Sequence, residues 1–266
     1  MLADNTGAAH LYDAGLDDQL TDLLDAFDPV SLEELDQRAA LLRRVDHKYA
    51  VSLERLRELA RGLQSDHQIL EIEGRRTFGY RSAYFDTPER RCFLDHVEDR
   101  VPRFKARTRM YEDTGQCVFE VKLKRTEDET DKRQVDHDLC ATRRLTPEAR
   151  ECLEEALMAV ALAVPDDLEH SLTTSFSRVT LAARRGSERL TCDLGVALGG
   201  ATGQTVHLHD GLVLVETKSE NGESPADALL ADLRVKPLSL SKYRVGIALL
   251  DPVRRGEPQP GSDLFA

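Results

Sequence analysis

The 266-residue sequence contains no tryptophan, and only 5% of its residues are aromatic. It also lacks any uninterrupted apolar run near the roughly 18 residues that a membrane-spanning helix needs. The N-terminus has neither the basic start nor the apolar stretch of a secretory signal. We therefore expect a soluble, cytoplasmic protein without a membrane segment.

Cysteine is infrequent, and its five residues are scattered without a C-x-x-C pair. An odd number at such spacing argues against a disulfide framework and against a zinc-thiolate site. We expect reduced thiols with structural roles. These are Cys92, Cys117, Cys140, Cys152 and Cys192.

Positive charge is in deficit overall, since the formal net charge is −12. The acids are concentrated at residues 1–42, with ten acids and one base, and at residues 145–174, with seven and one. Residues 43–144 and 175–250 instead carry small positive excesses of three and one charges. Net charge argues against nucleic-acid binding but does not describe the field inside a cleft, so an anionic ligand is not excluded.

Lysine is scarce as well, with eight residues against 28 arginines. Seven lysines fall in short strand-like or motif-like segments, and only Lys236 lies elsewhere. We infer that these segments require a compact point charge. The seven are Lys48, Lys105, Lys122, Lys124, Lys132, Lys218 and Lys242.

The pattern of apolar residues and capping residues predicts several helices. Ser31 and Glu34 form a capping box at the start of a short first helix. Ser52 is the N-cap of a helix that ends near Leu63, and Thr146 with Pro147 starts another that runs to about Val164. Two further helices are expected, over residues 224–233 and 242–250.

Strand-type alternation separates these helices, and residues 112–115 form a hairpin turn between two of the strands. The order of strands, helix, strands and helix suggests an internal duplication of the antiparallel α+β kind. Residues 1–30 are expected to be an acidic, poorly ordered lead-in, residues 31–250 the domain, and residues 251–266 a C-terminal tail. The expected strands are 44–51, 77–85, 101–111, 116–124, 132–139, 175–183, 188–196, 205–209 and 212–218.

Several strands carry charge on one face only. Between residues 104 and 111, alternation puts Lys105, Arg107 and Arg109 on the same face. An ordinary sheet with a solvated outer face would also show charged faces, but surface strands avoid three adjacent cations because they repel each other. If eight such strands close into a barrel with these faces inward, the interior holds side chains and one narrow ligand. That ligand would be a polyanion.

The charged segments occur in a characteristic order along the chain. They are Arg44-x-x-x-Lys48-Tyr49, Arg81-Ser-x-Tyr84-Phe-Asp86-Thr, Lys105-x-Arg107-x-Arg109-x-Tyr111, Phe119-Glu120-x-Lys122, Lys132-Arg133, Arg178, Arg189-x-x-x-Asp193, Val215-Glu216-x-Lys218 and Ser241-Lys242-Tyr243. Together these matching segments resemble the catalytic domain of the vacuolar transporter chaperone (VTC) polyphosphate polymerases, which belong to the triphosphate tunnel metalloenzymes. The resemblance covers about residues 32–250.

The resemblance implies an antiparallel, eight-stranded triphosphate-tunnel β-barrel with helices packed on its outside. It also implies that Glu216 binds Mn²⁺ or Mg²⁺, and that Glu120 either binds metal or pairs with neighbouring cations. The implied catalytic residues are Arg107, Arg109, Lys122 and Glu216. The implied phosphate-binding residues are Lys48, Arg107, Arg109, Lys122, Lys132, Arg178, Arg189 and Lys242.

Two departures from related families bear on function. The cyclase and thiamine-triphosphatase branch has a Glu-x-Glu-x-Lys signature in its first strand, whereas this chain has Arg44-Val-Asp46-His-Lys48, which favours the polymerase branch. The chain also lacks the membrane segments through which the eukaryotic complex is thought to pass its product. Export would then depend on a membrane-associated partner.

Three functions are compatible with these residues. The first is transfer of the ATP γ-phosphate onto a polyphosphate chain. The second is hydrolysis of triphosphate, nucleoside triphosphate or polyphosphate, and the third is non-catalytic binding of polyphosphate or an inositol phosphate. We expect several histidine and aromatic residues to be structural: His47 as a packing residue, His207 and His209 at the surface, and Tyr49, Tyr84 and Phe85 in the core or lining the barrel.

Overall fold

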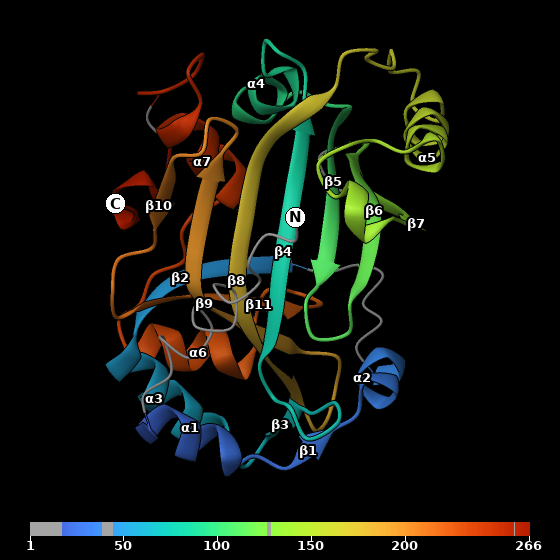
Figure 1. The fold of residues 1–266 in the computed structure, drawn as a ribbon. Coiled ribbons are helices and arrows are strands. Elements are labelled where there is room, and N and C mark those ends of the chain that lie inside the picture. The colour runs from blue at the N-terminus through green and yellow to red at the C-terminus, as the bar shows by residue number, and fades with distance from the viewer. Residues whose placement is uncertain (1–17, 39–44, 127–128, 258) are drawn as a thin grey trace, which may run out of the picture.

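The computed structural model describes residues 18–38, 45–126, 129–257 and 259–266 (Figure 1). Its centre is an antiparallel sheet whose eight main strands follow the order β2-β11-β9-β8-β4-β5-β6-β7. Three short strands extend it: β1 pairs with β3, β3 with β8, and β10 with β9. The strands are β1 Pro29–Val30, β2 Val45–Ser52, β3 His67–Leu70, β4 Phe78–Asp86, β5 Arg103–Tyr111, β6 Gln116–Lys124, β7 Thr130–Asp136, β8 Glu169–Ala183, β9 Arg189–Gly200, β10 Thr205–His207 and β11 Leu212–Ser219.

The helices lie around the sheet. In Figure 1, α1, α3 and α6 gather at one end, α4 and α7 at the other, and α5 lies beside β6 and β7. This arrangement confirms the expected fold class of an antiparallel, eight-stranded α+β structure with outer helices. The helices are α1 Asp18–Asp25, α2 Leu32–Arg38, α3 Leu53–Leu63, α4 Arg91–Val97, α5 Pro147–Met158, α6 Pro225–Asp232 and α7 Lys242–Leu250, and residues 139–141 and 262–264 form short 3₁₀ turns.

The sheet curves so that its charged faces look toward each other. In the described residues, β2 and β7 at the two ends of the strand order are not hydrogen-bonded to one another, and β2 passes behind the other strands in Figure 1. Lys122 on β6 nevertheless lies within electrostatic reach of Asp46 and Lys48 on β2. The opposite faces of β5 and β6 bury Phe104, Phe119 and their neighbours against α5. The charged faces therefore point inward, as the alternation predicts.

Short-range capping explains where most helices begin. The Ser31 hydroxyl accepts a hydrogen bond from the Glu34 backbone N–H, and Glu34 accepts from Ser31 in return. Ser52 and Thr146 cap α3 and α5, as expected. Helix α5 ends at Met158 instead of near Val164, because Ala161 adopts φ +55° and the following apolar residues pack individually against the core.

Other predicted boundaries also differ from the structure. Strand β7 ends at Asp136, since Asp138 caps a 3₁₀ turn there. Strands β3 and β8 extend the sheet beyond the predicted segments, and α4 was not predicted because its seven residues are too few to show a helical period. Arg44, assigned to the first strand from the sequence, lies outside the described residues.

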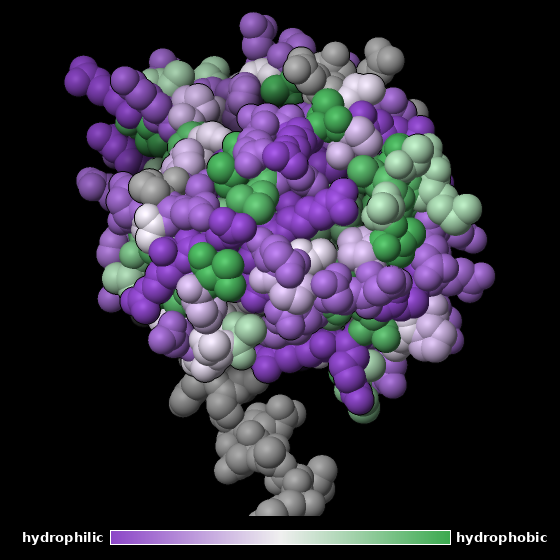
Figure 2. All heavy atoms as spheres, turned by 90° about the horizontal axis from the view of Figure 1, so that it is seen from above, coloured by the Kyte–Doolittle hydropathy of each residue, from purple (hydrophilic) through white to green (hydrophobic). Residues whose placement is uncertain are grey.

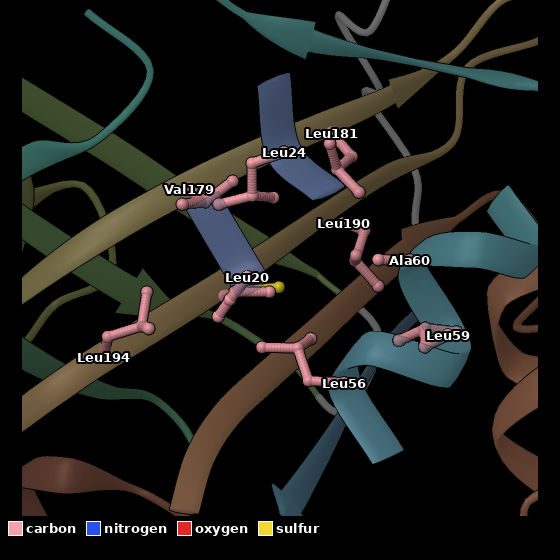
Figure 3. A pocket seen from close by; sticks show the side chains of 10 residues that line it. Leu20, Leu24, Leu56, Leu59, Ala60, Val179, Leu181, Leu190 and Leu194 are labelled. Carbon is pink, nitrogen blue, oxygen red and sulfur yellow. The ribbon is translucent and has the colours of Figure 1, made fainter. Parts of the chain in front are cut away.

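Residues 18–30 were expected to belong to the poorly ordered lead-in. The structure instead places α1 against α3 and buries Leu20, Leu24 and Phe27. Figure 3 shows Leu20 and Leu24 packed among Leu56, Leu181 and their neighbours. The space left there is about 10 Å³, which is close to the minimum for a single water molecule. This region is closed core and offers no room for a ligand.

The outer surface is mainly hydrophilic. Figure 2 shows hydrophobic residues in small, separate groups on the face seen from above. Among the described residues, the large exposed hydrophobic side chains are likewise dispersed over different elements, the most exposed being Met158 on α5. Within the same residues, no helix is long and apolar enough to cross a membrane.

A cationic interior as the candidate active site

The inward faces of the sheet gather cations around three carboxylates. The first group is centred on Asp193 of β9, which is paired in register with Arg178 of β8. Arg178 donates two hydrogen bonds to the Asp193 carboxylate, at 2.6 and 2.9 Å, and Lys242 Nζ lies 2.6 Å from Oδ2. Burial alone would raise the pKa of Asp193, but the charges of Arg178 and Lys242 lower it to about 2. Asp193 is therefore ionised at neutral pH.

Aromatic rings form one wall of this group. The Arg178 guanidinium lies 5.1 Å from the Tyr80 ring centre and 5.0 Å from that of Phe176, and these two rings are stacked. Lys242 Nζ lies 4.7 Å from the Phe176 ring centre. Ring faces attract cations and restrict their side-chain motion. The cations are thus held in position before any ligand arrives.

The second group is centred on Glu120 of β6. Arg107 Nε donates to Glu120 Oε2 at 2.7 Å, and Lys132 Nζ of β7 lies 2.6 Å from Oε1. Arg107 also donates to the Tyr84 hydroxyl at 3.0 Å. The Glu120 side chain is only 2% exposed; burial would raise its pKa, but the charges of Arg107 and Arg109 lower it to about 2.

The third group is centred on Glu216 of β11. Lys48 of β2 stands directly opposite Glu216 in the sheet, and its Nζ lies 3.6 Å from Oε1. Lys218 Nζ lies 2.8 Å from Oε2. Burial would raise the pKa of Glu216, but the charges of Lys218 and Lys48 hold it well below its usual range. The carboxylate keeps 23% of its side-chain surface exposed, in contrast to Glu120.

Two cations connect these groups without a carboxylate of their own. Arg109 donates to the Ser82 hydroxyl at 3.4 Å, and of the described residues none brings a carboxylate within ion-pair distance of it. Burial and then the charge of Arg107 lower the pKa of Arg109. Burial also lowers the pKa of Lys122, which feels Asp46 and Glu216 only at longer range. Such cations favour an anionic ligand between the groups.

Arg189 is less central than the resemblance implied. It stands opposite Lys218 on the inward side of the sheet, and its guanidinium lies 3.7 Å from Asp36 of α2. The structure therefore places Arg189 beside the Glu216 group, toward the edge covered by α2. The other implied phosphate-binding residues lie in or between the three groups.

The carboxylates differ in their fit to a divalent metal. Among the described residues, there is no cluster of three or more histidine, cysteine, aspartate or glutamate side chains that could hold a metal ion. Both Glu120 oxygens face cations within 2.7 Å, so its contacts in this structure are those of an ion-pair partner. Glu216 is more exposed, and one of its oxygens has only a long contact. It suits a cation whose remaining ligands are substrate oxygens and water.

The other histidine and aromatic residues that were expected to be structural lie in the core, near its edge or at the surface. Tyr49 is buried and donates to Asp227 at 2.7 Å, while Phe85 lies in the core beside α5. His47 Nδ1 lies 3.4 Å from the same Asp227 carboxylate. His207 and His209 are exposed, as expected.

The inward faces also contain partners that sequence reasoning did not assign to the site. Asp193 and Lys218 stood in the matching segments, but neither received a role. Tyr84, expected in the core or lining the barrel, is buried and contacts Arg107, and Tyr80 contacts Arg109 and Arg178. Their alternation on β4 was the available signal, and only the folded sheet shows which cations they contact.

Comparisons with known proteins show a remote structural likeness. A candidate adenylate cyclase from Bacillus halodurans is 16% identical over 75% of this chain and 94% of its own, with a TM-score of 0.49. A candidate adenylyl cyclase from Hippeastrum, whose structure is said to reveal a dominant triphosphatase activity, is 17% identical over 80% of this chain and 100% of its own, with a TM-score of 0.48. Both TM-scores lie below 0.5, so neither likeness carries an argument about function.

No curated protein matches the sequence at a significant level. The model of the VTC domain family, in contrast, matches residues 43–251. This match covers most of the chain and includes every strand and helix that contributes to the three charged groups. The chain therefore belongs to the VTC domain family.

Proposed function

We propose that this protein is a metal-dependent phosphotransferase that moves the γ-phosphate of ATP onto a growing polyphosphate chain and releases ADP. The observation that carries the proposal is the pair Arg109 and Lys122, two inward cations between three ion-paired groups. Neither has a close carboxylate among the residues that the structure describes. Membership of the VTC domain family supports the same class of substrate. A cytoplasmic location, where ATP is available, fits this reaction.

The arginines of β5 are placed to bind consecutive phosphates. Arg107 and Arg109 occupy neighbouring inward positions on one strand, about 7 Å apart along it. Guanidinium groups form paired hydrogen bonds with phosphate oxygens. Because Tyr84 and Glu120 already orient Arg107, little rearrangement is needed when a phosphate arrives.

Phosphoryl transfer needs no covalent protein nucleophile when donor and acceptor are held in line and their charge is neutralised. The cations that neutralise this charge come from two groups of elements. Lys48, Lys122 and Lys132 lie on β2, β6 and β7, and Arg178 and Lys242 lie on β8 and α7. We infer that these residues bind ATP and the polyphosphate chain, while Arg107 and Arg109 act on the phosphoryl group that is transferred.

Glu216 is the residue we assign to a divalent metal, Mn²⁺ or Mg²⁺. Its partly exposed carboxylate lies among lysines that also attract phosphate oxygens, so a phosphate-bound cation would meet an anionic ligand there. Such a cation would neutralise the oxygens of the reacting phosphates. Lys48 and Lys218 hold the two carboxylate oxygens in the ligand-free protein.

The experiment is incubation of the purified protein with ATP and Mn²⁺ or Mg²⁺, with ADP, free phosphate and long-chain polyphosphate measured separately. The proposal predicts that one phosphate is added to polyphosphate for each ADP formed. ADP with free phosphate alone would replace it with a hydrolase. Tight polyphosphate binding without turnover would replace it with a non-catalytic binding module.

A further inference from the structure

Three lysines form a row across neighbouring strands at the α4 side of the interior. Lys105 of β5 stands opposite Lys122 of β6, and Lys122 stands opposite Lys132 of β7. Residues directly opposite in an antiparallel sheet have their Cβ atoms about 5 Å apart, and like charges at such positions are destabilising. Lys132 is neutralised by Glu120. The repulsion therefore concentrates on Lys105 and Lys122.

Lys105 has polar neighbours but no close acid. Its Nζ lies 3.0 Å from His96 Nε2 of α4 and 3.3 Å from the hydroxyl of Ser241, the N-cap of α7. Within the described part of the chain, no carboxylate lies at ion-pair distance from Lys105 or Lys122. The second ring nitrogen of His96, Nδ1, is buried and has no hydrogen-bond partner among the described residues. This corner of the interior is rich in donors and poor in acceptors.

Most charged groups around this corner are cationic, and the nearby acids Asp99 and Glu120 are paired with Arg103 and Arg107. Lys105 faces Lys122 from β6, Arg103 and Arg107 from its own strand, and Arg244 from α7, with His96 supplied by α4. Burial and then Lys122 lower the pKa of the Lys105 amine well below its usual range. Burial and then Lys105 lower the pKa of His96 to about 2. His96 is thus neutral at neutral pH, and Lys105 loses its proton more readily than an exposed lysine.

We propose that Lys105, Lys122 and His96 form a further anion subsite, which takes phosphate groups of a polyphosphate chain beyond those held by Arg107 and Arg109. This inference rests on the proposed function, because it assumes a polyphosphate ligand. The anion supplies the missing negative charge between Lys105 and Lys122. It also favours the ammonium form of Lys105, so that the protonated fraction of the amine rises when the anion binds.

The position of Lys105 separates this subsite from the centre of the site. Lys105 lies one inward position beyond Arg107 on β5, next to α4 and α7, whereas Arg107 binds Tyr84 and Glu120. A short ligand that fills the arginine positions does not need Lys105. A longer chain extends along the cation row and does. The effect of Lys105 on affinity must therefore grow with chain length.

The test is calorimetric titration of the metal-free, full-length protein with two ligands. One is tripolyphosphate, and the other is a polyphosphate long enough to reach both the two arginines of β5 and the Lys105 subsite. Running each titration in buffers of different ionisation enthalpy gives the number of protons taken up. Lys105→Met should weaken binding of the longer chain more than tenfold, while tripolyphosphate affinity changes by less than about threefold. Lys105→Arg should keep the long-chain affinity but lose the proton uptake, because arginine stays charged.

The matched control is Lys236→Met, which removes an exposed lysine outside the charged strand faces. Equal loss of affinity for both chain lengths in Lys105→Met, or no loss for either, would overturn the subsite. Unchanged proton uptake in Lys105→Arg would overturn the role of Lys105 as the proton acceptor. Failure of the wild-type protein to bind either polyphosphate would instead count against the proposed function. Thermal unfolding of each variant shows whether the variant is folded. Lys105→Met should be at least as stable as the wild-type protein, because the substitution removes the repulsion between Lys105 and Lys122.

Discussion

Glu216 and Lys48 stand directly opposite each other on β11 and β2, yet their contact is loose, with Oε1 and Nζ 3.6 Å apart. Lys218 holds the other oxygen of the same carboxylate at 2.8 Å. Oε1 is therefore the atom that an incoming cation reaches with the smaller loss of existing contacts. This difference distinguishes Glu216 from Glu120, whose oxygens are both engaged at 2.7 Å or less.

Glu216→Gln should abolish turnover while the fold and most of the polyphosphate affinity remain, since the amide lacks the charge that a divalent cation requires. The measurement is the rate of ADP formation over a range of Mn²⁺ concentrations, together with calorimetric binding of tripolyphosphate. Glu151→Gln, an exposed change on α5, serves as the control. Full activity of Glu216→Gln at saturating Mn²⁺ would remove this residue from the site.

Arg109→Lys should lower the rate constant at saturating ATP by more than tenfold, with a smaller change in apparent affinity. Lysine keeps the charge but loses the planar group that binds two equatorial oxygens. The same change at Arg107 should have a similar kinetic effect, and it should also lower stability because Arg107 binds the buried Glu120. Steady-state kinetics with ATP as the varied substrate measures both parameters. A weakened affinity with an unchanged maximal rate would make these arginines ground-state anchors.

Glu120→Gln should lower the stability of the ligand-free protein by about 1–3 kcal/mol, because Arg107 and Lys132 lose the charge that neutralises them. Added tripolyphosphate should restore more stability to this variant than to the wild-type protein, since the anion replaces the lost charge. Thermal unfolding with and without ligand measures the difference. An altered Mn²⁺ requirement for turnover would show that Glu120 is a metal ligand after all.

Acid should destabilise the protein between about pH 4.5 and pH 2. The pKa values of Glu120 and Asp193 are about 2 in the folded protein, below their ordinary values of 4.5 and 3.8. Their contribution to stability is therefore complete above the ordinary values and disappears as the pH falls through the folded ones. Each contributes about 2–3 kcal/mol. Urea unfolding as a function of pH should show a flatter acid limb in Asp193→Asn, and an unchanged limb would contradict the ion-pair assignment.

Tripolyphosphate affinity should fall at least about tenfold between 50 and 200 mM salt, because each contact is an ion pair between a fixed cation and a mobile anion. Arg109→Met should reduce the slope of this dependence, whereas Lys236→Met should leave it unchanged. The measurement is a binding titration at several salt concentrations. An affinity that does not respond to salt would exclude binding by the inward cations.

Most helices and strands, and the strand faces that point inward, could be predicted from local sequence patterns. Strand alternation has a period of two, and helix caps act over three residues, so both are visible in a short window. Alternation therefore placed Lys105, Arg107 and Arg109 together correctly. Local patterns did not predict two helices. The burial of α1 depends on contact with α3, and the short segment of α4 shows no clear helical period.

Which cations are neutralised by a carboxylate depends instead on contacts between residues far apart in the sequence. Lys242 reaches Asp193 across 49 residues of sequence, and Lys105 reaches Ser241 across 136. Contacts at such separations depend on how the sheet curves and where α7 packs, which no local pattern contains. The same packing engages both oxygens of Glu120 and leaves one of Glu216 accessible, because burial and the surrounding charges, and not residue type, decide what each carboxylate binds.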